Sequence, residues 1–208
     1  MIVVPAVSSP LVPLPRSFYE GSVLDIARAM IGKVLVHVLP DGPVAGRIVE
    51  AEAYRGPEDL AAHSSGGRRT KRTEAMWGPP GHAYMFLLYG MHWAFNVVVS
   101  PEGHPHAVLV RAIEPVLGAA QMAARRGVEV ASTRLTNGPG KLCAALGLSG
   151  ADYGEDLCGP RLFLADGQAR AGIGRSARIN VDYAGAWAEK PWRFYEKGNR
   201  YVSVAPRG

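Results

Sequence analysis

Short apolar segments, most of them bounded by glycine or proline, follow one another along the whole chain. Three of these segments are rich in β-branched residues and predict strands, at residues 33–39, 44–54 and 107–113. A longer segment, residues 82–99, is apolar and aromatic on both sides of Tyr89-Gly90. That pattern predicts two strands joined by a tight turn at the glycine.

Helices should be few and short, because glycine and proline interrupt the chain often. Three are predicted, at residues 22–32, 115–126 and 139–147, and the second of them is expected to begin at Pro115. Residues 64–81 are expected to form a loop, and the C-terminal third short strands and turns. The pattern favours an extended N-terminal arm over residues 1–16 and one mixed α/β (α+β) domain over residues 17–208.

Composition narrows the class of protein. Of the 208 residues, 48% are hydrophobic and 20% are charged, which is typical of a globular domain. The 25 glycines and 16 prolines argue against a coiled coil, a helical bundle or a solenoid. No apolar run reaches the length of a membrane span, and the N-terminus lacks the basic start of a signal peptide. Cys143 and Cys158 do not have the spacing of a metal site, so we expect both to be free thiols. Together these features predict an intracellular protein that does not bind membranes.

Charge suggests the kind of partner. The net charge is +5, from 23 basic and 18 acidic residues, and 18 of the bases are arginines. A basic surface favours an anionic partner such as nucleic acid, and the arginine fork matches phosphate in a bidentate way. A GC-rich genome would raise the arginine content as well, so this ratio alone does not decide the function.

Two carboxylates lie close together on the predicted strand of residues 44–54. Because alternate side chains of a strand share a face, Ile48, Glu50, Glu52 and Tyr54 should share one face and small apolar residues the other. The small face should pack inward, which leaves the carboxylates and Tyr54 able to line a cleft. The alternative is a solvated face on which the charges protect a sheet edge.

Two further segments carry basic residues. The predicted loop has four bases within residues 68–72, Arg68 and Arg72 among them, beside glycines and hydroxyl groups. Such bases suit contacts to a phosphate backbone, and the alternatives are a solvated basic loop or a localisation signal. Lys141 follows Asn-Gly-Pro-Gly near the start of a predicted helix, where backbone amides favour an anion.

Tyr89 and Met91 flank the glycine at the predicted hairpin tip, where polar residues are usual. Large apolar groups at an exposed tip need a partner, and a wedge between base pairs is one such use. The alternative is a tip that is buried against another element. Asn96, in the apolar second strand, must find hydrogen bonds, either for structure or to bind the edge of a ligand.

In this order the segments resemble the alkyladenine (3-methyladenine) DNA glycosylase family, from about residue 17 to residue 204. The glutamate strand and the aromatic hairpin are together the most specific part of the resemblance. The matching segments are Gly46-Arg-Ile-Val-Glu-Ala-Glu-Ala-Tyr54, Gly56-Pro-Glu-Asp59, Ala62-His-Ser64, Gly66-Gly-Arg68, Tyr89-Gly-Met91, Asn96, Arg111-Ala-Ile-Glu-Pro115, Gly138-Pro139, Lys141-Leu-Cys143, Lys190-Pro191 and Arg193-Phe-Tyr195. The resemblance implies a single domain around a curved antiparallel sheet, with flanking helices and a protruding β-hairpin that enters the minor groove.

The resemblance also implies roles for residues of the site. Glu52 corresponds to the general base, and Arg111 to the arginine that helps to hold the attacking water. Tyr54 corresponds to one wall of a base pocket and His63 to the other, with Phe86 where the family often has tyrosine.

The same resemblance assigns the contacts to the substrate. Asn96 corresponds to an asparagine that disfavours guanine-type bases, and Tyr89 to the residue that intercalates into the duplex. The other residues expected to contact DNA are Met91 at the hairpin tip and Arg68, Arg72 and Lys141 at phosphates.

The implied activity is monofunctional base excision from double-stranded DNA. An alkylated or deaminated purine (3-methyladenine, 7-methylguanine, hypoxanthine or ethenoadenine type) is flipped out, and water activated by Glu52 hydrolyses its N-glycosidic bond. No metal, organic cofactor or lysine nucleophile is implied, and we expect a DNA-associated monomer, in the cytoplasm or nucleoid of a bacterial source. Two other classes remain open: a damage-binding protein of the same fold with little or no catalysis, and a sugar hydrolase that uses Glu50 and Glu52.

Overall fold

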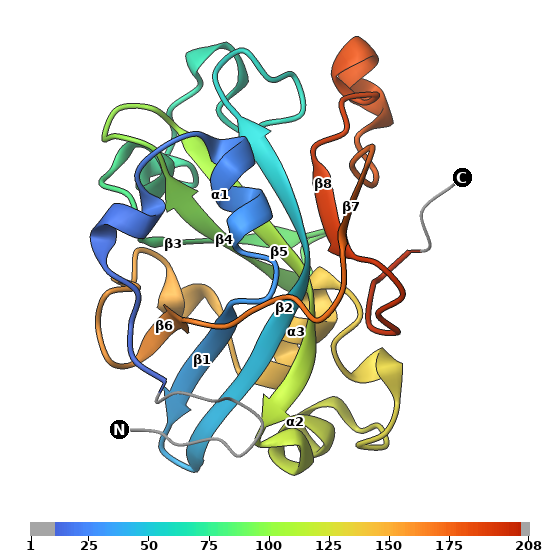
Figure 1. The fold of residues 1–208 in the computed structure, drawn as a ribbon. Helices are drawn as coiled ribbons and strands as arrows, with labels where there is room; N and C mark the ends of the chain where they lie inside the picture. Colours follow the sequence, from blue (N-terminus) through green and yellow to red (C-terminus); the bar gives the residue numbers. More distant parts are fainter. Residues whose placement is uncertain (1–10, 205–208) are drawn as a thin grey trace.

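The computed structural model describes residues 11–204, which form one eight-stranded sheet, three α-helices and several 3₁₀ turns (Figure 1). Every pairing between these strands is antiparallel, so the fold is of the predicted α+β class. The strands are β1 (Val34–Leu39), β2 (Gly42–Arg55), β3 (Ala83–Leu88), β4 (His92–Val99), β5 (His106–Leu117), β6 (Leu162–Ala165), β7 (Ile173–Ser176) and β8 (Arg193–Glu196). The helices are α1 (Val23–Ala29), α2 (Ala119–Arg126) and α3 (Pro139–Leu146).

Strand β2 is the centre of the sheet. The strand order is β3-β4-β5-β2-β1-β6, and β8 pairs with both β2 and β7. The first half of β2 pairs with β1 and the second half with β8, while β5 pairs with β2 along nearly its whole length. Glu50 and Glu52 therefore lie on an interior strand between β5 and β8. The alternative of a solvated, charge-protected sheet edge is wrong.

Two irregularities interrupt the pairing of β2 with β5 beside the carboxylates. The register shifts on either side of Glu50, which leaves Val49 on β2 and Arg111 on β5 without a direct partner in this pair. An extra residue in one strand reverses the alternation of faces beyond it. Ile48 consequently packs in the same core cluster as Ala51. The prediction that Ile48 shares a face with Glu50 is therefore wrong.

Pro115 belongs to β5 and does not begin a helix, which corrects the predicted start of α2. Strand β4 pairs with β5 only up to Leu109, so at Pro115 no strand among residues 11–204 occupies the side away from β2. Proline is tolerated in a sheet where its missing N–H is not needed by a neighbouring strand. Gly118, with φ of 70°, then ends the strand and directs the chain into α2.

The other predicted elements are confirmed to within a few residues, including the two short helices α1 and α3 and the hairpin of β3 and β4. The predicted loop of residues 64–81 contains two 3₁₀ turns, Ser65–Gly67 and Glu74–Trp77. Cys143 is buried, Cys158 is partly buried, and both are free thiols.

The main core lies between the sheet and the helices. Helix α1 packs on β2 and β5, and α3 packs on β4, on β5 and against α2. Phe95, Met30 and Ile48 are among the largest side chains that are completely buried there. Burying one such side chain contributes about 1.5–3 kcal/mol, so this core holds β2 and β5 firmly behind the carboxylates.

The N-terminal arm is described only from Leu11 onward, and residues 1–10 lie outside the described residues. Leu11 is buried, Pro13 forms a bridge with Ala165, and the Leu14 N–H donates to the Leu164 oxygen at 2.8 Å. This part of the arm therefore runs along β6. Within residues 11–204, no helix has the length and apolar character needed to cross a membrane.

Candidate active site

Glu52 is completely buried, and both of its carboxylate oxygens accept hydrogen bonds. Oε2 accepts from the Tyr54 hydroxyl at 2.8 Å and from Arg111 Nη1 at 3.3 Å, and Oε1 accepts from the backbone N–H of Ile179 at 2.8 Å. Burial, reinforced by the neighbouring charge of Glu52, holds the pKa of Tyr54 well above its usual value. The Tyr54 hydroxyl therefore keeps the proton that it donates to Glu52.

Glu50 is also completely buried, but its surroundings differ. Oε1 accepts from Arg111 Nε at 3.1 Å, Arg193 Nε at 2.7 Å and Ser203 Oγ at 2.9 Å, and Oε2 accepts from the Ser203 N–H at 2.6 Å. Each carboxylate oxygen has two lone pairs: Glu50 accepts three bonds at Oε1 and one at Oε2, whereas Glu52 accepts one at Oε1 and two at Oε2. The difference between the two lies in their partners, because Glu50 is held by two guanidinium groups and Glu52 by one.

This difference bears on the sugar-hydrolase alternative. Such enzymes need two available carboxylates that flank the bond to be cleaved. Glu50 is completely buried, accepts hydrogen bonds from two arginines, and shares one of them, Arg111, with Glu52 on one side of the site. Burial disfavours the Arg111 cation, but the charges of Glu52 and Glu50 outweigh burial and raise the pKa of Arg111. Glu50 thus holds Arg111 in place, and the arrangement does not fit a pair of glycosidase carboxylates.

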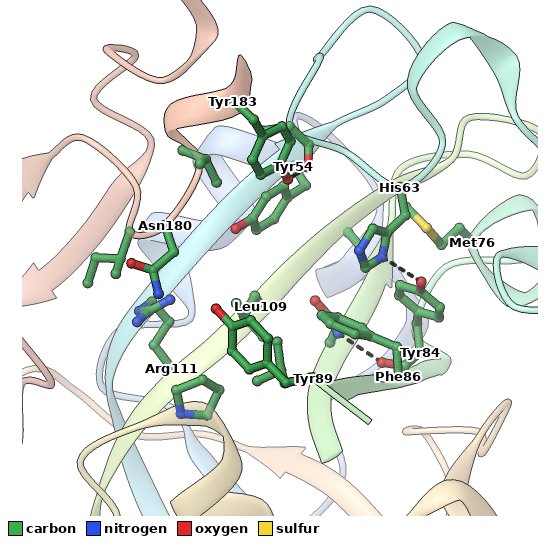
Figure 2. Close-up of a pocket in the computed structure, with 17 residues that line it drawn as sticks. Tyr54, His63, Met76, Tyr84, Phe86, Tyr89, Leu109, Arg111, Asn180 and Tyr183 are labelled. Carbon is green, nitrogen blue, oxygen red and sulfur yellow. Dashed lines mark hydrogen bonds between the residues drawn. The ribbon is translucent and has the colours of Figure 1, made fainter. Parts of the chain in front are cut away.

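A pocket with a volume of about 270 Å³ lies next to Arg111 and has mostly aromatic and apolar walls (Figure 2). Tyr54 and Tyr183 lie on one side of the pocket, and His63 and Phe86 on the other. Aromatic walls that face each other across a small cavity suit a planar, aromatic ligand. Of the residues predicted for the base pocket, all four line it: Tyr54, His63, Phe86 and Asn96. The carboxylates of Glu50 and Glu52 were expected to line a cleft as well, but both are completely buried and neither belongs to the pocket lining. Glu52 is connected to the pocket through the lining residues to which it is hydrogen-bonded.

His63 is held by two neighbouring aromatic side chains. Its Nδ1 shares a hydrogen bond of 2.8 Å with the Tyr84 hydroxyl, and its ring centre lies 4.5 Å from that of Phe86 with the ring planes at 85° (Figure 2). Burial, together with the charges of Arg72 and Arg68, lowers the pKa of His63 to about 4. The imidazole is therefore neutral at neutral pH.

Asn96 is buried in β4, where its Nδ2 donates to the backbone oxygen of Tyr84 at 3.0 Å. That bond fixes the orientation of the amide at the pocket wall. The two uses considered for Asn96, structural support and contact with a ligand edge, are compatible here, because the residue lines the pocket as well.

The hairpin tip is exposed, and the alternative of a buried tip is wrong. Tyr89 is 79% exposed and Met91 72% exposed. Tyr89 and Gly90 have φ of 51° and 70°, a conformation that glycine adopts readily and tyrosine rarely. Tyr89 also lies at the pocket lining, so the tip and the pocket are adjacent.

The basic residues of the predicted loop differ in their availability. Arg69 is paired with Glu74 at 2.5 Å, whereas Arg68 and Arg72 are exposed and form no ion pair with the part of the chain that the structure describes. Both lie close enough to the pocket for their charges to act on His63.

Lys141, on α3, belongs to a second basic group, which it forms with Arg126 and Arg134. Its Nζ donates to Asn137 Oδ1 at 2.8 Å. Partial burial and the nearby charges of Arg126 and Arg134 lower the pKa of Lys141. These cations therefore repel one another, which favours an anion at this surface.

Several residues of the site were not singled out from the sequence. Ile179, which donates to Glu52, lies 127 residues further along the chain, and Asn180, Val181 and Tyr183 complete the pocket wall. Local patterns do not reveal such a contact, because the two residues are far apart in the sequence and meet only in the folded chain. Arg193 belongs to one of the matching segments, but its sequence gives no sign of its bond to Glu50.

The comparisons with known proteins agree with this geometry. The chain matches the family model described as Methylpurine-DNA glycosylase (MPG) over residues 17–200. It is 49% identical over 199 residues to a protein of Desulfitobacterium hafniense (strain Y51), covering 92% of this chain and 98% of the relative. It is 47% identical over 200 residues to a protein of Bacillus cytotoxicus, covering 91% and 98%. Both relatives carry the name "Putative 3-methyladenine DNA glycosylase".

The fold, the site and these matches define a DNA glycosylase, a hydrolase that cleaves N-glycosidic bonds in damaged DNA. More narrowly, the chain belongs to the methylpurine-DNA glycosylase family, which confirms the resemblance found in the sequence. Its partner is damaged DNA and its place is in DNA repair. A binding protein without catalysis, one of the alternatives above, does not agree with this family.

The neutral state of His63 gives a testable dependence of stability on pH. The unfolded chain binds a proton at His63 below about pH 6.5, whereas the folded protein binds it only near pH 4. Stability from this residue should be fully present above the unfolded value and should fall as the pH drops from 6.5 to 4, by on the order of 3 kcal/mol. We expect the unfolding free energy of His63→Gln to lack this component in urea titrations at several pH values. If the free energies of unfolding of wild type and variant changed in parallel with pH, this prediction would be wrong.

Proposed function

We propose that the protein excises damaged purines from double-stranded DNA, with Glu52 as the general base and Arg111 as its partner. The proposed substrates are alkylated or deaminated purines of the 3-methyladenine, 7-methylguanine, hypoxanthine and ethenoadenine type. One observation carries the proposal: the buried carboxylate of Glu52 accepts hydrogen bonds from Tyr54, Arg111 and Ile179, and all three donors line an aromatic pocket that has an exposed hairpin tip at its lining. The name of the relatives agrees with the first of these substrates.

A base within a duplex hides its glycosidic bond, so the damaged nucleotide must be flipped out before hydrolysis. Tyr89 fills the gap that the nucleotide leaves, and its exposure supports this role. The flipped base enters between Tyr54 and the wall formed by His63 and Phe86. Stacking on aromatic side chains contributes about 1–3 kcal/mol per base, and Phe86 retains the ring that such stacking needs.

In the proposed hydrolysis, a water oxygen bonds to C1′ of the sugar while the bond from C1′ to the base nitrogen breaks. Glu52 accepts the proton of the water, and the bonding electron pair leaves with the base. The transition state resembles an oxocarbenium ion, so the negative charge of Glu52 also stabilises it. The hydrogen bonds from Tyr54, Arg111 and Ile179 support this role by fixing both carboxylate oxygens.

The charge of the damaged base determines whether the leaving group needs additional stabilisation by the pocket. A cationic base such as 3-methyladenine or 7-methylguanine leaves as a neutral molecule, whereas a neutral base needs a proton or strong hydrogen bonds. Asn96, whose amide is fixed by Tyr84, supports a contact that disfavours bases with a 2-amino group. His63 is neutral and so adds no charge of its own to the pocket at neutral pH.

Replacing Glu52 tests the proposed function directly. Glu52→Gln keeps the shape and the acceptor for Ile179 but removes the base, so single-turnover release should fall by about 10²–10⁴-fold. Binding of a lesion-bearing duplex should stay within a few fold of wild type. Glu50→Gln is unsuitable as a control, since Glu50 holds Arg111 and Arg193. The exposed Glu102 provides a better one, and Glu102→Gln should release bases at the wild-type rate. Near-normal release by Glu52→Gln would exclude Glu52 as the base.

The wedge role of Tyr89 is tested by Tyr89→Asn. Asparagine tolerates the positive φ at this position, so the turn is kept while the ring is lost. Release from duplex DNA should slow markedly, because the gap left by the flipped base is unfilled. Release from a single-stranded lesion should change much less, since fewer stacked bases are displaced. Equal losses on single and double strands would mean that Tyr89 serves only the packing of the hairpin.

Contacts to phosphates should appear in the salt dependence of binding. Each phosphate contact contributes about 0.9 to the slope of log K against log salt concentration. Arg68→Ala should therefore flatten the slope by about one unit on undamaged duplex DNA. Arg125 is paired with Asp41, at the end of β2 opposite to Tyr54, so Arg125→Ala is a matched control whose slope should equal that of wild type. An unchanged slope for Arg68→Ala would remove Arg68 from the interface.

A further inference from the structure

Arg178 and Asp59 form an ion pair in which both side chains are completely buried. Arg178 Nη1 donates to Asp59 Oδ2 at 2.5 Å and Nη2 donates to Oδ1 at 2.9 Å, which is a bidentate geometry. The backbone oxygens of Ala53 and Trp187 accept further bonds from these nitrogens at 2.9 and 3.1 Å. The guanidinium is thus fixed in position and orientation.

This cation lies against the proposed base-stacking residue. Its Cζ is 4.8 Å from the centre of the Tyr54 ring and 5.1 Å from that of Trp192. Tyr54 lines the pocket, whereas Arg178 does not and has no exposed side-chain surface. The guanidinium therefore packs on the side of the Tyr54 ring that is turned away from the pocket.

We propose that Arg178 is a positioning residue that acts through Tyr54 and biases the pocket toward neutral damaged bases over cationic ones. The inference rests on the proposed function, because it requires Tyr54 to stack on the flipped base. It concerns a property that the catalytic residues do not set, namely the relative rates at which bases of different charge are released.

The direction of the bias follows from the electrostatics of an aromatic ring. A ring attracts a cation through the negative potential over its two faces. A guanidinium held against one face draws that electron density toward itself and weakens the attraction of a second cation to the other face. Because Asp59 neutralises the pair as a whole, the effect acts through the ring that Arg178 contacts and not as a net charge beside the pocket. Stacking of a neutral base depends mainly on overlap and dispersion, so it is affected less.

The two classes of damaged base differ both in charge and in how readily they leave the sugar. Purines methylated at N3 or N7 carry a positive charge and leave readily, whereas hypoxanthine and ethenoadenine are neutral and leave poorly. Weaker stacking of a cationic base lowers its residence in the pocket, while a neutral base keeps its full contact with Tyr54. Arg178 would thereby narrow the difference in rate between the two classes.

Three variants separate the charge of Arg178 from its structural role. Arg178→Gln removes the cation but leaves Asp59 unpaired, so the double variant Arg178→Gln/Asp59→Asn is added to keep the buried site neutral and hydrogen-bonded. Arg178→Lys keeps a cation behind Tyr54 while it loses the planar fork. Each enzyme is given duplexes with 7-methylguanine or hypoxanthine at one position, and single-turnover rates are measured for both. Thermal unfolding establishes that each variant is folded.

We expect the ratio of the 7-methylguanine rate to the hypoxanthine rate to rise about tenfold in the double variant, and to stay near the wild-type value in Arg178→Lys. A purely structural role would lower both rates together and leave the ratio unchanged, because the folded fraction cancels. In a Tyr54→Leu background, removal of the Arg178 cation should no longer move the ratio.

A ratio within twofold of wild type in a folded double variant would overturn the inference. An equal rise in Arg178→Lys would overturn it as well, since the charge is retained there. Failure of the proposed function has a different signature, namely base release that survives Glu52→Gln. If Glu52→Gln abolishes release but the ratio does not move, only the inference about Arg178 fails.

Discussion

Two carboxylates are buried next to each other on one interior strand, and the fold must neutralise them. Taking a charged group out of water costs several kcal/mol even after the protein relaxes. Glu50 and Glu52 on β2 are compensated by Arg111 from β5 on one side and, for Glu50, by Arg193 from β8 on the other. The observed register of the three strands brings these opposite charges together, so the ion pairs favour that register. The irregularity at Arg111 belongs to this arrangement, because a displaced strand residue re-aims its side chain.

The same network gives two chemically identical side chains different tasks. Glu50 accepts four hydrogen bonds, two of them from Arg111 and Arg193, and so holds these two side chains in place. Glu52 accepts three, from groups on β2, β5 and the segment before β8, and all three of these donors line the pocket. A carboxylate that is fixed by residues of the pocket wall suits proton abstraction from a water held in that pocket. The hydrogen bonds that offset the cost of burying Glu52 are therefore the same ones that fix its carboxylate, the proposed catalytic group.

Local signals in the sequence were sufficient for elements that local physics determines. The hairpin could be predicted because Tyr89-Gly90 interrupts two apolar runs, and the positive φ of Gly90 is a property of that residue type. The face of Ile48 could not, because the bulge beside Glu50 depends on pairing with a distant strand. The predicted helix start at Pro115 was wrong for a related reason. Proline fits into β5 there because β4, which would need its N–H, has already ended.

The residues of the candidate site divide in the same way. Those carried by motifs, such as Glu52 and Tyr54, could be named from the sequence through a resemblance to a family. Ile179 and Arg178 could not, because their importance lies in contacts with β2 that span more than half of the chain. A single sequence contains these residues but not the pairing of β8 with β2 that gives them a role.

Charge is arranged differently on the surface and beside the pocket. The chain has a net charge of +5, and exposed bases such as Arg68 and Arg72 attract an anionic polymer over a distance set by the salt concentration. The buried groups instead balance: the carboxylates of Glu50, Glu52 and Asp59 face the guanidiniums of Arg111, Arg178 and Arg193. His63 is neutral as well, so these buried groups together carry no net charge that would draw in one class of ligand. Attraction to DNA can then be strong and unselective, while the choice of a base is left to ring stacking, pocket shape and the few hydrogen-bonding groups in the wall.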